Sequence, residues 1–121
     1  MRLAPVPMFY YPDQLTAAKY AAESSRSTHG ADECLDACRL FAGTITQALA
    51  GCTKEETLFG QRAEFEGSTK IIAIADGLYG HKSETQIRGT GYVVDSLEAA
   101  LWCERQFIVF SGWKNRGNLR R

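Results

Sequence analysis

Apolar residues recur in steps of three and four through the region 35–52. This spacing matches the period of an α-helix with one buried face and does not match the alternation of a strand. Gly51 follows the stripe and is a typical stop signal. The pattern therefore predicts an amphipathic helix whose buried face is formed by Leu35, Cys38, Phe41, Ala42, Ile45, Ala48, Leu49 and Cys52.

Two further helices are predicted on either side of this one. Asp13 precedes the helix-compatible segment 14–23, where its carboxylate could accept hydrogen bonds from the first free amides. Thr53 and Glu56 have the spacing of a capping box and would begin a short helix that runs through Phe59. The inner face of the earlier helix is expected to comprise Leu15, Ala18, Ala22 and Ser25.

The pattern weakens between residues 60 and 91. Its one strongly apolar run, KIIAIA at 70–75, fits a buried strand and a helix segment equally well. The segment 89–94 carries two glycines of a dinucleotide-binding G-x-G-x-x-G but has Val94 in place of the third, so we interpret it as a turn leading into a helix. A helical stripe then resumes and is expected to end near Cys103, with Asp95 and Glu98 as a capping pair. The predicted class is all-α, with an irregular connection and tail.

Composition is that of an ordinary globular domain, with 45% hydrophobic and 23% charged residues and a formal net charge of zero. No apolar run approaches the ~20 residues that span a bilayer, so no membrane association is expected. The prolines in the opening residues interrupt any signal-peptide pattern, and we expect a cytoplasmic protein. Basic residues gather after residue 103, but a solvated end explains them better than a nucleic-acid partner, which we consider unlikely.

Cysteines and aspartates give no clear metal site. Cys34 and Cys38 lie one helical turn apart near His29, a set that could hold zinc, but buried free cysteines are the favoured interpretation for all four. The aspartates are scattered, without a D-D or D-x-D pair. Asp32 and Asp36 share a helix face and are expected to be solvated. We therefore predict no metal ligands in this chain.

Three segments together resemble the ADP-ribosylglycohydrolases, all-helical hydrolases related to the dinitrogenase reductase activating enzyme. They are MRLAPV at the start, AAESSRSTHGADECLDACRLFAG, and IADGLYGHKSETQIRGTGYVVDSLEAALW. The S-x-T-H-G joint and the G-T-G-Y-V-V-D-S-L-E-A-A-L-W block carry most of the likeness, which runs over roughly residues 1–103. The resemblance implies part of that family's helical bundle.

The resemblance also implies magnesium-dependent hydrolysis of an ADP-ribosyl bond. The family holds two metal ions between a threonine-aspartate-aspartate cluster and a D-x-D-T cluster, and such ions activate water. Neither cluster occurs in this sequence. We therefore expect a hydrolase-family chain that is truncated at both ends, has no cofactor of its own and is inactive alone.

Four residues match the family's ADP-ribose pocket. Met1 aligns with the end of a loop at the phosphate site, His29 with a histidine near the diphosphate or distal ribose, and Gly91 and Tyr92 with a turn at the ribose and adenine end. For His29 the alternative is a structural corner between helices with no ligand. The partner implied for the pocket is ADP-ribose or an ADP-ribosylated substrate.

These observations lead to a division of the chain at residue 103. Residues 1–103 would be the central segment of the helical domain, and residues 104–121 a divergent basic tail, interpreted as a frameshifted end. The alternative function is a non-catalytic module that binds ADP-ribose or another nucleotide, or that docks a helix face on a partner. An incomplete fold would also leave apolar surface uncovered and favour association.

Overall fold

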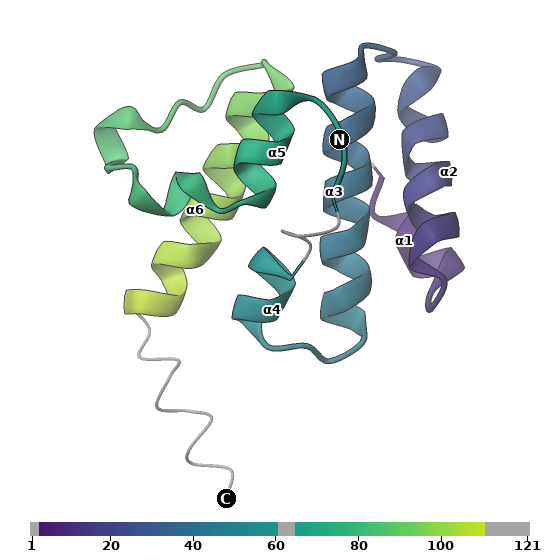
Figure 1. The fold of residues 1–121 in the computed structure, drawn as a ribbon, viewed down its shortest axis with the longest axis horizontal. Coiled ribbons are helices and arrows are strands. Elements are labelled where there is room, and N and C mark those ends of the chain that lie inside the picture. Colours follow the sequence, from purple (N-terminus) through teal and green to yellow (C-terminus); the bar gives the residue numbers. More distant parts are fainter. Residues whose placement is uncertain (1–2, 61–64, 111–121) are drawn as a thin grey trace, which may run out of the picture. The chain divides into compact units, whose positions relative to one another are not determined.

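The fold is all-α, as the sequence predicts. The computed structural model describes residues 3–60 and 65–110, and within these ranges it contains six α-helices, two short 3-10 helices and no strand (Figure 1). The chain divides into two compact units, Met1–Leu78 and Tyr79–Arg121.

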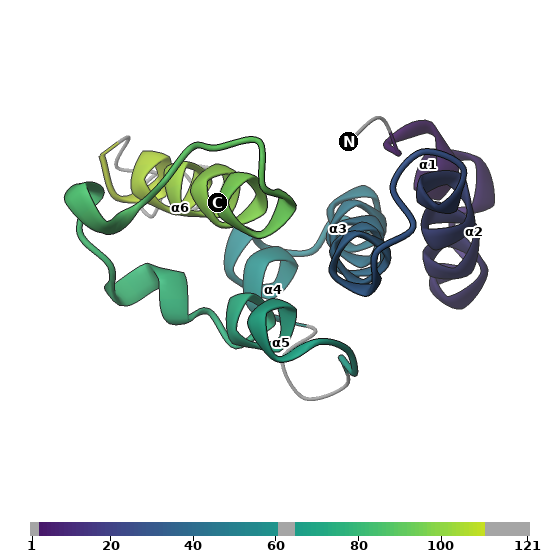
Figure 2. The ribbon, with the colours of Figure 1, turned by 90° about the horizontal axis from the view of Figure 1, so that it is seen from above.

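The first unit is built around its longest helix. This helix, α3 (Asp32–Leu49), has α2 (Gln14–Arg26) along one side and α4 (Lys54–Phe59) and α5 (Thr69–Ala75) along the other (Figures 1 and 2). The short α1 (Pro5–Tyr10), which the sequence analysis did not anticipate, packs against both α2 and α3. Proline is compatible with the first turn of such a helix because its missing amide hydrogen would have no partner there.

Small side chains join α2 to α3. Ala17 and Ala21 are fully buried, and Ala21 belongs to a core cluster with Leu3, Cys38 and Ala42. The predicted inner face of α2 is wrong at Leu15, which is 86% exposed. Methyl groups allow the two helix backbones to approach closely, so the helix turns its alanines inward and leaves the larger leucine at the surface.

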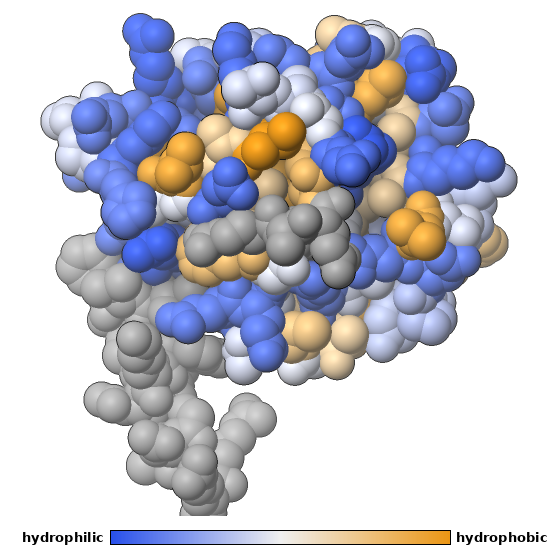
Figure 3. Space-filling model, viewed as in Figure 1, coloured by the Kyte–Doolittle hydropathy of each residue, from blue (hydrophilic) through white to orange (hydrophobic). Residues whose placement is uncertain are grey.

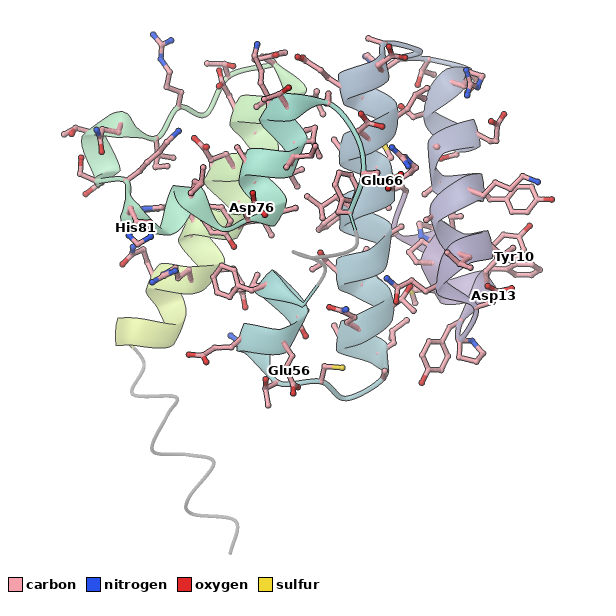
Figure 4. All side chains as sticks on the ribbon, in the orientation of Figure 1. Tyr10, Asp13, Glu56, Glu66, Asp76 and His81 are labelled. Atoms are coloured by element: carbon pink, nitrogen blue, oxygen red, sulfur yellow. The ribbon has the colours of Figure 1, made fainter. Side chains whose placement is uncertain are left out.

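The predicted helix ends are largely confirmed. Asp13 accepts a hydrogen bond from the amide of Thr16 at 3.1 Å (Figure 4 shows this carboxylate at the end of α2 near α1). The capping box is present, with Thr53 and Glu56 bonded to each other's amides at 3.2 and 2.8 Å. Gly51 adopts a positive φ of 82°, which glycine reaches without strain just past a helix.

The ambiguous KIIAIA run forms α5. Ile71 and Ile74 are buried on one side of it, with exposed fractions of 0% and 2%. The stripe on α3 fades earlier than predicted, since Leu49 is 46% exposed and Cys52 is also exposed. Burial of this stripe therefore ends before the helix does.

The second unit packs a connection against one helix. The 3-10 helices Leu78–His81 and Glu84–Gln86 precede α6 (Val93–Phe110), and Trp102 donates from Nε1 to the carbonyl of Lys82 at 2.9 Å. Lys82 also pairs with both carboxylate oxygens of Glu98, at 2.8 and 2.9 Å. The predicted capping role of Glu98 is therefore wrong, because its carboxylate anchors the connection instead.

Two expectations about the end of the chain have different outcomes. The helix does not stop near Cys103, because α6 continues to Phe110. The division into a segment 1–103 and a tail 104–121 stays a prediction, and residues 111–121 lie outside the described part.

The described surface includes large apolar side chains. Phe9 is 80% exposed in α1, while Leu15 is 86% exposed in α2. Figure 3 shows orange, apolar residues reaching the surface between blue, hydrophilic ones. Association through such residues stays a prediction. None of the described helices combines the length and the apolar character needed to cross a membrane.

Candidate functional site

The corner between α2 and α3 carries the predicted pocket histidine. Ser25 organises it: its carbonyl accepts from the amides of Thr28 and His29 at 3.0 and 2.6 Å, and its hydroxyl donates to the carbonyl of His29 at 2.9 Å. Both backbone polar groups of His29 are thus bonded to one serine. The last turn of α2 therefore fixes the backbone from which the imidazole projects.

The imidazole of His29 is on the surface. The residue is exposed, and Nδ1 lies 3.2 Å from the hydroxyl of Thr28. Such a ring can donate to or accept from a ligand oxygen, and the Thr28 contact limits its rotation. This geometry is compatible with both interpretations of His29, as a structural corner and as a pocket residue. The bonds from Ser25 that form the corner involve the backbone of His29 and not its ring.

The second predicted region is the turn that leads into α6. Thr90 accepts a hydrogen bond from the amide of Tyr92 at 3.1 Å and donates its hydroxyl hydrogen to Asp95 at 2.8 Å. The carbonyl of Tyr92 accepts from the amide of Ser96 at 3.0 Å, the first bond of the helix. Asp95 therefore does not cap the helix as predicted, because the helix begins before it. The interpretation of this segment as a turn leading into a helix is confirmed.

The turn leaves space for close approach of another molecule. A Cβ atom built on Gly91 meets no atom within 4 Å apart from those of its two chain neighbours, and the same holds for Gly89. Neither glycine has a positive φ. Tyr92, which is 40% exposed, directly follows this open stretch of backbone. An aromatic ring at such a position offers a stacking face.

The predicted site residues are thus distributed over two units. His29 belongs to the first unit, and Gly91 and Tyr92 belong to the second. Met1 lies outside the described residues. The role of each as a ligand contact stays a prediction.

Asp36 was missed by the sequence analysis. It is only 8% exposed, and the expectation of a solvated carboxylate is wrong. Its oxygens accept from the amide of Ser68 at 2.7 Å and from the guanidinium of Arg39, which also donates to the carbonyl of Glu66 at 3.0 Å. A Cβ on Gly67 would lie 2.9 Å from Asp36 Oδ2. This contact spans residues distant in sequence, and only the tertiary structure brings them together.

Asp36 is ionised in this environment. Burial alone would raise the pKa of its carboxyl group, but the hydrogen bonds from Arg39 and Ser68 outweigh burial and hold that pKa below its ordinary value. The charged carboxylate fastens the segment before α5 to α3. The bond between Asp36 and the amide of Ser68 joins α3 to the residue that precedes α5, which is a structural role.

The cysteines divide into buried and exposed sets. Cys38 is buried, as predicted, and Cys34 is partly buried, whereas Cys52 and Cys103 are exposed and contradict the prediction. Burial raises the pKa of the Cys38 thiol, despite an opposing hydrogen bond with Ser25. Cys38 therefore behaves as a small core residue.

The described residues do not form a cluster of magnesium ligands. Across 3–60 and 65–110, no group of three or more His, Cys, Asp or Glu side chains is placed to hold a metal ion. Clustered carboxylate oxygens are what magnesium requires. These residues do not by themselves fit the ion.

Comparisons with known proteins agree with the motifs in these two regions. The family model for ADP-ribosylglycohydrolase matches residues 1–111. The ADP-ribosylarginine hydrolase Tri1 of Pseudomonas putida (strain GB-1) is 41% identical over 102 residues, which are 84% of this chain and 27% of that protein. The protein of the same name from Serratia proteamaculans (strain 568) is 30% identical over a stretch of equal coverage.

The chain spans about a quarter (27%) of the length of these curated relatives. No solved structure matches it. The family model covers both the histidine corner and the turn before α6. On this evidence, the chain belongs to the ADP-ribosylglycohydrolase family.

Proposed function

We propose that this chain contacts ADP-ribose but does not cleave an ADP-ribosyl bond by itself. Tyr92 carries the proposal. The residue is 40% exposed and follows Gly91, whose Cβ position is free of atoms from all residues except its two chain neighbours. Stacking of a base on an aromatic ring contributes about 1–3 kcal/mol in nucleic-acid complexes, and the adenine of ADP-ribose presents the same type of face.

His29 is proposed as a separate contact for an oxygen of the diphosphate or distal ribose. Its support is the exposed imidazole on a backbone that Ser25 fixes through three hydrogen bonds. Since that backbone does not depend on the ring, replacing the ring should remove a ligand contact and leave the corner intact.

Catalysis is proposed to require residues beyond those of this chain. The sequence has no D-D or D-x-D pair that could help to hold two divalent ions. The residues of this chain would supply binding of ADP-ribose. Because the two relatives carry the name ADP-ribosylarginine hydrolase, the substrate class we propose is ADP-ribosylated arginine.

Calorimetric titration of ADP-ribose into the full chain, with and without magnesium, tests the binding half. We expect binding that does not depend on the metal and that Tyr92→Ala weakens about tenfold, in line with the loss of one stacking contact. Tyr11→Ala is the matched control, because Tyr11 is similarly exposed at 42%. Absence of binding, or equal losses in both variants, would contradict the proposal.

Two further measurements complete the test. His29→Ala should weaken binding, whereas His81→Ala, which removes another exposed imidazole, should not. The chain should release no ADP-ribose from ADP-ribosylated arginine. If the chain does release ADP-ribose, and a substitution of one of its own side chains abolishes that release, the proposal that it does not cleave the bond by itself is refuted.

A further inference from the structure

We propose that Thr90 and Asp95 are positioning residues that hold Tyr92 in the orientation in which it contacts ADP-ribose. This inference rests on the proposed function, and it assigns the two residues a role in binding although neither is proposed to contact the ligand. We call the pair, together with its two hydrogen bonds, the Thr90–Asp95 bridge.

The bridge fixes the amide of Tyr92. Tyr92 donates to Thr90 Oγ1 at 3.1 Å, and that hydroxyl donates its own hydrogen to Asp95 Oδ2 at 2.8 Å. A backbone amide only donates, so Thr90 Oγ1 accepts from Tyr92 and its own hydrogen is directed to Asp95. Because the carbonyl of Tyr92 is bonded to the amide of Ser96, both backbone polar groups of the tyrosine are held.

The bridge also explains how an aromatic residue can stand at this position. Tyr92 directly precedes the first residue of α6 and accepts its first helical bond, which is the N-cap position. Residues favoured there have a short side chain that accepts a bond from the first turn, and a tyrosine ring cannot do this. Thr90 and Asp95 order the turn from either side of the cap. The cap residue itself can then be aromatic.

Ordering the backbone that carries the ring before binding should increase affinity. Immobilising a side chain on binding has a free-energy cost, and a residue that is already ordered avoids part of it. Loss of the bridge should therefore weaken binding by up to about tenfold, the change expected from about one immobilised side chain. The ring itself would still be present, so the loss should not exceed that of Tyr92→Ala.

Two measurements on the full chain test the bridge. One is the dissociation constant for ADP-ribose by calorimetry, and the other is the hydrogen-exchange rate of the Tyr92 amide by NMR. Thr90→Val preserves the shape and removes both bonds, whereas Thr90→Ser keeps the hydroxyl. Asp95→Asn weakens the second bond. Ser96→Ala is the control, since it removes a neighbouring hydroxyl that donates to the carbonyl of Val93 at 3.2 Å and is not part of the bridge.

We expect Thr90→Val to weaken binding and to accelerate exchange of the Tyr92 amide about tenfold, Asp95→Asn to have a smaller effect, and Thr90→Ser and Ser96→Ala to match the unmodified chain. Unchanged affinity in Thr90→Val would overturn the inference while leaving the proposed function intact. If the unmodified chain binds no ADP-ribose, the proposed function fails and the binding role of the bridge fails with it. The exchange rates would then report only whether the two bonds order the turn.

Discussion

Replacing Asp36 with asparagine should destabilise the first unit markedly. The carboxylate is 8% exposed and accepts one bond from the amide of Ser68 and one from the guanidinium of Arg39. Asparagine can still accept the amide bond, but it loses the charge and the charged hydrogen bond. A hydrogen bond to a charged group contributes about 1.5–3 kcal/mol. Since the Arg39 side chain is 36% exposed, water compensates part of the loss, and we expect a decrease of about 2 kcal/mol in the free energy of unfolding.

The measurement is urea unfolding followed by circular dichroism. Asp32→Asn is the matched control, one turn earlier on the same helix and exposed. That change should cost at most about 1 kcal/mol, through the weaker interaction with the helix dipole. Equal midpoints for the two variants, or an Asp36→Asn protein as stable as the unmodified one, would refute the assignment of Asp36 as a structural anchor.

The same experiment has a pH dependence with a defined sign. The folded-state pKa of Asp36 is lowered from 3.8, so its contribution is fully present above pH 3.8 and is lost as the pH falls through the lower folded value. The stability difference between the unmodified chain and Asp36→Asn should therefore shrink in acid below pH 3.8. A difference that grows in acid would contradict the cause given for the shift.

Three other predictions follow from the packing. Gly67→Ala should lower the free energy of unfolding by about 1–3 kcal/mol in urea, because its Cβ would lie 2.9 Å from Asp36 Oδ2; an unchanged midpoint would argue against this contact. In timed thiol labelling read by mass spectrometry, exposed Cys52 should react well before buried Cys38, and the reverse order would contradict the burial. If the apolar surface drives association, Leu15→Ser should shift sedimentation toward the monomer, and an unchanged oligomer distribution would exclude this side chain from the contact.

Most of the helical framework could be predicted locally. The helix cap at Asp13, the capping box at Thr53 and the stop at Gly51 depend on residues within one turn of each other, so sequence spacing determines them. The stripe of α3 was visible for the same reason, since its period is a property of the helix itself. The family motifs also lie in short continuous segments.

The sequence could not predict in the same way which face of a helix is buried or which distant side chains bond to each other. The pattern on α2 allows Leu15 to face inward, but close contact with α3 selects the alanines instead. The bonding of Glu98 to Lys82 joins residues too far apart for any helical spacing to indicate. The same holds for the candidate site. The motifs located His29 and Tyr92, whereas the bonds that hold the backbones of these residues appeared only in the structure.

The sequence by itself determined an all-α chain of the ADP-ribosylglycohydrolase family and the places where most of its helices begin and end, because caps and helical periodicity act over a few neighbouring residues. Only the tertiary structure decided that KIIAIA is a helix, that Asp36 is an internal anchor, and that Thr90 bonds the amide of Tyr92. Burial and charge pairing depend on which side chains meet across the fold, and a linear pattern does not contain that information.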